Sequence, residues 1–213
     1  MKPRTIILGT IGAAAAGFLA WRWISRVRHL PCPFWLSWML ENPIVEAIRG
    51  TRVTLEHIGV RPGERCLDVG AGPGRLTIPA ARLVGSQGAV VALDAQPEML
   101  EQLRRRLEQE GLTNVTLAQG DIALESCLAS ESESFDRAWL ITVLGEIPYG
   151  EVALRNLFRL LKPGATLSIT EFLPDPHFQR RGTVLRLCGD AGFAPSEFNG
   201  SPVAFTQNFS KPA

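Results

Sequence analysis

The chain has 213 residues, of which 46% are hydrophobic and 20% are charged, so it is long enough to bury one sizeable core. Its 22 basic and 21 acidic residues give a formal net charge of +1, which argues against a strongly basic nucleic-acid-binding protein and against an acidic disordered chain. We therefore expect no nucleic-acid partner. Four cysteines stand singly, without a paired zinc-ligand spacing, so we assign no metal.

The N-terminal residues 5–21 carry no charge and have basic side chains on both sides. Extended to Ile24, this segment would make about 30 Å of helix, which matches the hydrocarbon thickness of a bilayer. We predict that residues 1–28 form a single transmembrane anchor in the lipid bilayer. Because arginines follow the apolar stretch, the rest of the chain is expected in the cytosol. A cleaved signal peptide is the alternative.

Two further features predict contacts in or at the membrane. Gly9, Ala13 and Gly17 are spaced four residues apart on one face of the predicted span, a pattern that packs two helices closely and would give a homodimer. The next region, 29–60, holds an apolar block with two tryptophans beside arginines, which is typical of an amphipathic segment at the bilayer interface. The alternative is a helix that packs on the core of the domain itself.

Short apolar runs recur every 22 to 28 residues in the following part of the chain, and most are separated by helix-like stretches such as Pro97–Glu110. The predicted strands are Arg65–Val69, Ala89–Leu93, Val115–Gln119, Arg137–Val143 and Ala165–Glu171. A buried strand that returns through a helical crossover builds a parallel sheet covered on both faces. The fold class is therefore α/β, with a Rossmann-like, doubly wound and mostly parallel sheet.

The alternation changes near the C-terminus. A helix is predicted at about Gln179–Ala191, followed by two strands at Pro195–Asn199 and Val203–Phe209 that are separated by Gly, Ser and Pro. Two strands joined by so short a turn pair antiparallel, so we expect them at one edge of the sheet.

A glycine-rich turn follows the first strand directly. Asp68 leads into glycines at 70, 72 and 74, which lets a ligand approach the backbone where a strand turns into a helix. The dinucleotide fingerprint requires a third glycine at the sixth position, where this chain has Arg75. Asp94 and Asp121 follow the second and third strands, at the edge of the sheet where open α/β folds bind ligands.

These segments resemble the class I S-adenosylmethionine-dependent methyltransferases, from about residue 61 to the C-terminus. The resembling motifs are LDVGAGPG, ALDAQPEML, QGDI, FDRAWLITVLGEIP and LLKPGATLSITE. The resemblance implies a seven-stranded sheet with an antiparallel last strand and S-adenosyl-L-methionine as cofactor. It also implies these roles: Asp68, Gly70, Ala71, Gly72 and Gly74 border the methionine moiety, Asp94 followed by Ala95 borders the ribose, Asp121 and Ile122 border the adenine, and Thr142 lies near the reactive methyl.

The segment VLGEIP is similar to the VLHEIP of ubiquinone/menaquinone-type (methyltransferase type 11) enzymes, except that Gly145 stands in place of His. Candidate catalytic groups are Glu146 and His177, with Glu171 and Asp175 as further carboxylates at the same edge. Each has a structural alternative, since Glu146 may equally be expected to cap a turn and His177 to lie in a plain loop.

The sequence therefore predicts a methyltransferase domain at 61–213 that acts at the cytosolic membrane face on a small, hydrophobic acceptor such as a lipid, quinone, thiol or amine. A sulfonium carries its own leaving group, so the main requirement is in-line placement of the acceptor. One alternative is a catalytically inactive membrane-bound scaffold that retains the fold. Another is a nicotinamide-dependent oxidoreductase, which the glycine spacing disfavours.

Overall fold

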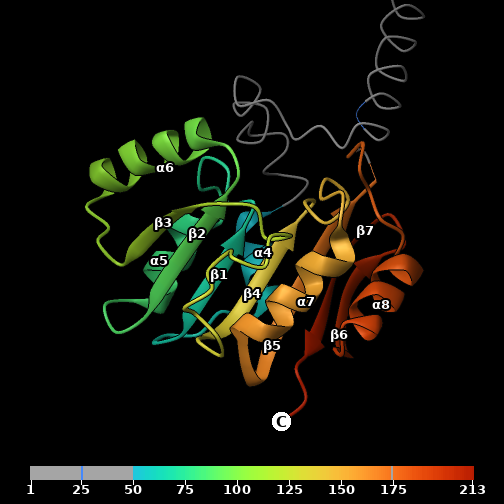
Figure 1. Ribbon diagram of the computed structural model, residues 1–213. Helices are drawn as coiled ribbons and strands as arrows, with labels where there is room; N and C mark the ends of the chain where they lie inside the picture. Colours follow the sequence, from blue (N-terminus) through green and yellow to red (C-terminus); the bar gives the residue numbers. More distant parts are fainter. Residues whose placement is uncertain (1–24, 26–49, 174) are drawn as a thin grey trace, which may run out of the picture.

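A computed structural model describes Ser25, residues 50–173 and residues 175–213 (Figure 1). Apart from Ser25, the predicted anchor at 1–28 lies outside these residues, and so do the small-residue face of Gly9, Ala13 and Gly17 and the apolar block of the interfacial region. Within the described part of the chain, no helix is both long and apolar enough to cross a bilayer.

Helices and strands alternate through the described region, as expected. In chain order the elements are α4 (Thr51–Ile58), β1 (Arg65–Val69), α5 (Thr77–Val84), β2 (Ala89–Asp94), α6 (Pro97–Glu110), β3 (Val115–Gln119), β4 (Phe135–Ile141), α7 (Gly150–Leu160), β5 (Leu161–Phe172), α8 (Arg181–Asp190), β6 (Ala194–Ser201) and β7 (Ala204–Ser210).

The seven strands form one sheet in the order β3-β2-β1-β4-β5-β7-β6. Strands β1 to β5 pair in parallel, whereas β7 runs antiparallel to both β5 and β6. The predicted mostly parallel sheet with an antiparallel last strand is therefore confirmed. The strand order reverses direction between β1 and β4, and open α/β sheets bind their ligands at the carboxyl ends of strands at such a point.

Helices cover both faces of the sheet (Figure 1). One face packs against α4, α5 and α6, and Leu55, Ala80 and Leu103 represent these three helices in the buried clusters of that side. The other face packs against α7 and α8 through Leu157 and Val184. The loops that leave the carboxyl ends of the strands lead to helices on both faces of the sheet. Loops from the two helical layers therefore meet at this edge.

The structure corrects the bounds of the fourth strand. The sequence pattern placed it at Arg137–Val143, but β4 spans Phe135–Ile141. Thr142 adopts a φ of 58°, a left-handed conformation that no strand residue can keep, so the chain leaves the sheet there. The predicted late helix and two late strands correspond to α8, β6 and β7 with shifts of one or two residues at their ends.

Helix α4 is fastened to the sheet at its C-terminal end. Arg137 of β4 is buried, forms a two-bond ion pair with Glu64 at 2.9 Å, and donates to the carbonyl oxygen of Ile58 at 2.7 Å. Asn208 of β7 donates to the carbonyl oxygen of His57 at 2.7 Å. These bonds satisfy carbonyls that a helix terminus leaves unpaired, and they set the height of α4 above β4 and β7.

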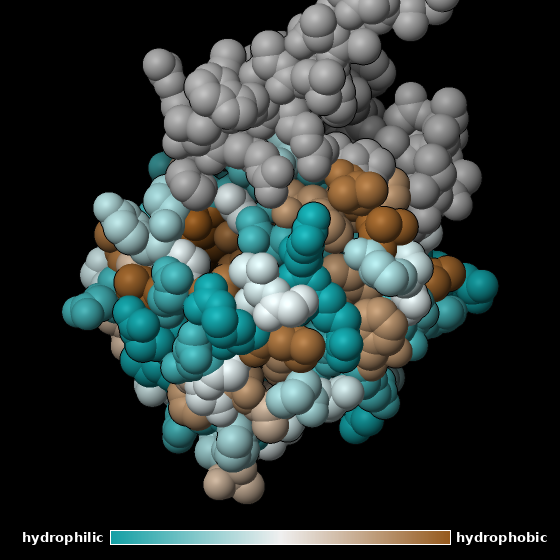
Figure 2. Space-filling view, turned by 90° about the vertical axis from the view of Figure 1, so that its right-hand side faces the viewer, coloured by the Kyte–Doolittle hydropathy of each residue, from teal (hydrophilic) through white to brown (hydrophobic). Residues whose placement is uncertain are grey.

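Strand β6 is the exposed edge of the sheet, on the side of the molecule shown in Figure 2. Hydrophilic and hydrophobic side chains are interspersed on that surface. Pro195 lies within β6, and the guanidinium of Arg181 stacks over the ring of Phe198 at 4.4 Å. A proline and a covered aromatic ring both discourage pairing with a further strand.

Candidate functional site

The three glycines of the turn after β1 all have positive φ, at 71°, 55° and 94° for Gly70, Gly72 and Gly74. They differ in their surroundings. A Cβ added at Gly70 would overlap Val143 of the loop after β4, and one at Gly74 would overlap Leu103 of α6. At Gly72 an added Cβ would meet no atom of the described residues within 4 Å. Gly72 is therefore the glycine that leaves open space for a ligand at the backbone.

Asp94 at the end of β2 is bonded to this turn. Its carboxylate accepts the backbone N–H of Gly72 at 2.8 Å and the N–H of Gln96 at 2.9 Å, one on each oxygen. Burial is the main influence on its pKa and raises it. The backbone N–H of Ala95 also bonds to this carboxylate, and since a carboxylate offers about four acceptor positions, room remains for a hydroxyl donor. The arrangement fits a ribose, whose two neighbouring hydroxyls can be held by one carboxylate.

Asp68 belongs to β1, just before the same turn, and is more deeply buried than Asp94. It is 3% exposed and accepts the hydroxyl of Thr77 at 2.6 Å. Burial raises the pKa of its carboxyl to about 6, against the lowering effect of the Thr77 bond and of the Arg75 guanidinium. A buried carboxylate is well suited to attract a cationic ligand group, such as the ammonium of a methionine moiety.

The remaining predicted donor-site residues lie at the same edge of the sheet. Ala71 is buried against α6, and Ala95 is exposed. Asp121 is exposed and accepts the N–H of Ala123 at 2.8 Å, while the side chain of Ile122 is buried in the core. The structure thus brings the glycine turn, Asp94 and Asp121 to one side of the carboxyl edge, and the individual cofactor contacts stay predictions.

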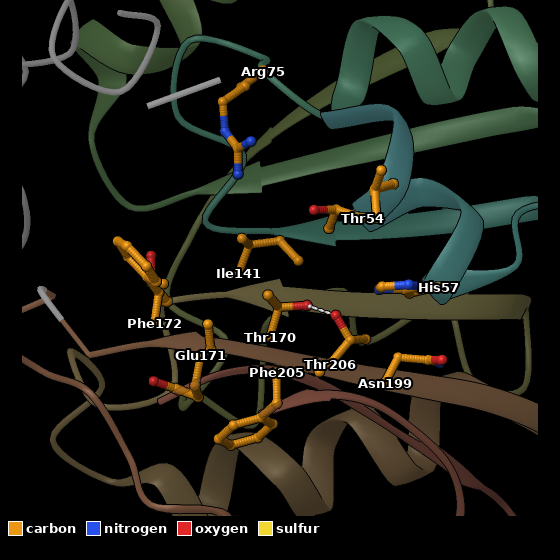
Figure 3. A pocket seen from close by; sticks show the side chains of 14 residues that line it. Thr54, His57, Arg75, Ile141, Thr170, Glu171, Phe172, Asn199, Phe205 and Thr206 are labelled. Carbon is orange, nitrogen blue, oxygen red and sulfur yellow. Dashed lines mark hydrogen bonds between the residues drawn. The ribbon is translucent and has the colours of Figure 1, made fainter. Parts of the chain in front are cut away.

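A cavity of about 150 Å³ opens beside Thr142, between α4 and the sheet (Figure 3). The backbone N–H of Thr142 donates to the carbonyl oxygen of Thr170 at 2.8 Å, which holds its left-handed conformation in place. Non-glycine residues in this region are uncommon and concentrate at functional sites. Thr142 therefore lines a second hollow at the carboxyl edge, and the next residue, Val143, packs against Gly70 of the glycine turn.

The two predicted catalytic residues lie in neighbouring loops. Glu146 is half-buried in the loop after β4, and its backbone N–H donates to the carbonyl of Val143. His177, in the loop after β5, is 3% exposed, and its Nε2 shares a hydrogen bond of 2.8 Å with the hydroxyl of Ser25. The loops meet at Gly145, where any added Cβ would overlap the carbonyl oxygen of His177. The loop backbone therefore occupies the room that a histidine at 145 would need.

Sequence reasoning missed several residues of the cavity and one support of the turn. Arg75, His57 and Asn199 line the cavity, yet they belong to three segments with no shared motif. The guanidinium of Arg106 in α6 donates to the carbonyl of Pro73 in the glycine turn at 2.9 Å. The position of Arg75 directly after the glycine turn could have indicated that it lies near the site. No local pattern in the sequence indicates the same for His57, Asn199 or Arg106.

Comparison with known proteins agrees with this geometry. Residues 61–185 match a protein family described as a methyltransferase domain, so the chain belongs to that family. The ubiquinone/menaquinone biosynthesis C-methyltransferase UbiE of Yersinia enterocolitica is 38% identical over 122 residues, covering 57% of this chain and 47% of that protein. This chain thus aligns with about half the length of that relative.

Two solved structures share the fold. A SAM-dependent methyltransferase from Aquifex aeolicus superposes with a TM-score of 0.77 at 21% identity, covering 85% of this chain and 100% of that one. The cyclase SpnF superposes with a TM-score of 0.68 at 18% identity, covering 78% and 81% of the two chains. At these identities the likeness concerns the fold.

The family match and the fold together define the class of this protein. It is an S-adenosylmethionine-dependent methyltransferase, with S-adenosylmethionine as its cofactor. Within that class, the aligned relative is a C-methyltransferase of ubiquinone and menaquinone biosynthesis.

Proposed function

We propose that this chain transfers the methyl group of S-adenosylmethionine to a small, mainly apolar acceptor of the quinol or phenol type at the cytosolic face of a membrane. The observation that carries the proposal is the cradle of Gly72 and Asp94, which combines open space at the backbone with a carboxylate that has acceptor positions left. The name of the UbiE relative supports the acceptor class.

The residues of this chain bind and orient. When bound, the cofactor supplies a methyl group on a sulfonium, which is already activated for transfer. Asp94 would hold the ribose hydroxyls, Asp68 would attract the ammonium, and Gly72 allows close approach of the backbone. The main task left to the protein is to place the acceptor in line, within about 3–3.5 Å of the methyl carbon, and to exclude water. Glu146 and His177 are the proposed groups that accept a proton from the acceptor.

The membrane location rests on the uncharged stretch at 5–21 and its basic flanks. Confinement to a bilayer surface raises the local concentration of a lipid-soluble acceptor, which is why an anchor and an apolar acceptor belong together in the proposal. Pairing of two spans through Gly9, Ala13 and Gly17 would make the anchored enzyme a homodimer. Alkaline carbonate extraction of membranes that carry the full chain tests the anchor, because release into the supernatant would contradict it.

Isotope transfer tests the activity itself. The purified full chain is incubated with membrane extract and S-adenosylmethionine that carries a deuterated methyl group, and lipids are then analysed by mass spectrometry. We expect a labelled, quinone-type product and steady release of S-adenosylhomocysteine. No binding of the donor at millimolar concentration would refute the proposal.

An inactive membrane-bound scaffold is the second candidate, and the packing at Gly145 is the observation in its favour, because it leaves no room for the histidine found in the resembling enzymes. The fold shared with the cyclase SpnF also shows that this architecture is compatible with other roles. Tight donor binding without turnover in the same assay would favour the scaffold.

A further inference from the structure

Two neighbouring apolar side chains face outward at one corner of the carboxyl edge. β5 and β7 pair as far as Phe172 and Ala204, and the backbone N–H of Leu173 then donates to the carbonyl oxygen of Val203 at 2.7 Å. Leu173 is 44% exposed and Val203 is 49% exposed. Hydrophobic side chains are visible along the upper rim of the surface in Figure 2. We call Leu173 and Val203 the apolar tip.

Arg52 lies on one side of the apolar tip, in the first turn of α4. The next residue, Val53, lines the cavity described above together with Ala204, the neighbour of Val203. The side chain of Arg52 is 87% exposed, and its distance to Glu56 of the same helix is 3.3 Å. An exposed pair of this kind contributes little to stability, so the guanidinium can bind a second anion at small cost.

Arg180 lies on the other side of the tip, directly before α8. The backbone N–H of the preceding residue, Gln179, donates to the carboxylate of Glu171 at 2.9 Å, which holds this part of the loop against the end of β5. Arg180 is exposed and forms no ion pair with any residue that the structure describes. Because α4 and α8 pack on opposite faces of the sheet, the tip has a cation on each side.

The acidic side chains of this corner are either buried or farther from the tip. Glu56 lies one turn farther along α4, and Glu197 lies four residues before the end of β6. Asp175 is half-buried and accepts the backbone N–H of His177 at 2.8 Å, and Glu171 is 1% exposed. The exposed charge beside the tip is therefore positive, which suits the anionic phosphates of lipid headgroups.

Ser25 places the end of the predicted anchor at the same corner. Its hydroxyl shares a hydrogen bond of 2.8 Å with Nε2 of His177, in the loop that begins at Leu173. The uncharged stretch is predicted to span the bilayer as far as Ile24, so Ser25 is the first residue after the predicted span. A bilayer that held this span would therefore have its surface next to the apolar tip.

We propose that the apolar tip and its two flanking arginines form a second membrane contact, through which the folded domain docks on an anionic bilayer. Leu173 and Val203 enter the interfacial region, and Arg52 and Arg180 bind lipid phosphates. Apolar side chains flanked by basic ones are typical of surfaces that lie in the bilayer interface without crossing it. The proposal rests on the membrane location given under the proposed function, and it turns the carboxyl edge toward the bilayer.

A dye attached at the tip tests this contact directly. Val203→Cys is labelled with the fluorophore NBD in the full chain carrying Cys32→Ser, since the other three cysteines are buried. Leu83→Cys is the matched control, because Leu83 is 48% exposed near the C-terminal end of α5. Both proteins are placed in vesicles of phosphatidylcholine and phosphatidylglycerol whose acyl chains carry bromine. Interfacial contacts reach about 5–10 Å into the bilayer, so we expect bromine to quench the dye at 203 at least about threefold more than at 83.

Two results would overturn the contact. One is equal quenching at positions 203 and 83. The other is a blue-shifted dye at 203 that bromine does not quench, which would show that residues 26–49 of the same chain cover the tip. Carbonate extraction of the same vesicles separates the two proposals. An unquenched tip in a retained chain refutes the contact alone, whereas an unquenched tip in a released chain refutes the membrane location as well.

A pair of arginine variants tests the charge. Arg180→Gln removes a cation beside the tip, and Arg186→Gln, farther along α8, removes one that is exposed and pairs with Asp190. A basic residue near an anionic surface contributes about 1 kcal/mol, so Arg180→Gln should lower the ratio of docked to undocked domain about fivefold, measured by quenching at 203. Arg186→Gln should leave this ratio unchanged. Equal ratios for the two variants would show that Arg180 does not bind lipid.

Discussion

The proposed donor half of the carboxyl edge and the cavity beside Thr142 are built in different ways. The donor half depends on two short segments, the turn 70–74 and the end of β2 at Asp94, which are held together by a direct backbone-to-carboxylate bond. The cavity beside Thr142 is assembled from α4 and four strands, with side chains from residue 53 to residue 206. A site made from contiguous residues is recognisable as a motif, whereas a site assembled by the fold is visible only after folding.

The largest expected effect is a difference in the free energy of unfolding between variants of two glycines in the donor half. Gly70→Ala forces a Cβ onto Val143 at a positive φ and should lower the free energy of unfolding by about 3 kcal/mol, which urea denaturation measures. Gly72→Ala has the same backbone strain without the overlap, so we expect a loss of about 1 kcal/mol in stability together with weakened donor binding. Equal destabilisation by both would contradict the distinction.

The second effect is a pH dependence of stability from Asp68. Burial raises the pKa of its carboxyl from the ordinary value of 3.8 to about 6, so the folded state holds the proton to higher pH. The unfolding free energy of the ligand-free protein should therefore fall as pH rises from 4 through 6, by up to about 3 kcal/mol. Asp68→Asn keeps an acceptor for Thr77 and should remove the share of this slope that Asp68 contributes, leaving the share of Glu171, whose pKa burial raises to about 8. An unchanged slope in urea titrations would show that Asp68 is ionised without penalty.

The third effect contrasts two carboxylates of the donor half. Asp94→Asn keeps the shape of the side chain but removes its charge, and we expect S-adenosylmethionine binding to weaken by about 1–3 kcal/mol in calorimetry. Asp121→Asn is the matched control, since Asp121 is exposed and is expected only to border the adenine. A larger loss at Asp121 would shift the ribose contact away from Asp94.

The smallest effect tests the support of the turn. Arg106→Gln removes the guanidinium bond to the Pro73 carbonyl and should weaken donor binding by about 0.5–1.5 kcal/mol. Arg105→Gln serves as control, because Arg105 is exposed and pairs with Glu101 within the same helix. If the two variants lose the same affinity, the turn needs no support from α6.

The sequence predicted the strands and helices best where periodicity and end signals agree. α6 was placed at Pro97–Glu110, the bounds it has in the structure, because Pro begins the helix and Gly111 adopts the left-handed conformation that ends it. β4 was placed two residues late, because Val143 continues the apolar run and nothing in the sequence shows that Thr142 leaves the strand.

The candidate site was predictable only in its donor half. Gly70 and Gly72 look alike in the sequence. Only the packing shows that Val143 fills the space beside Gly70, whereas the space beside Gly72 is open. The bond from Arg106 to Pro73 spans 33 positions of sequence, so no local pattern indicates it. The cavity requires the pairing of β5 with β7, whose residues are 36 positions apart at the Thr170–Thr206 bond. Long-range pairings of this kind leave no local signal.

The hydrogen bonds that hold α4 to the sheet also bear on how a molecule could enter the cavity. The bonds from Arg137 and Asn208 hold the C-terminal carbonyls of this helix, whereas Val53, near its first turn, is 44% exposed. Any tilting of the helix would pivot about the anchored end and widen the gap at the other. A small molecule that occupied the cavity would then pass Val53, at the end of α4 that these two hydrogen bonds do not hold.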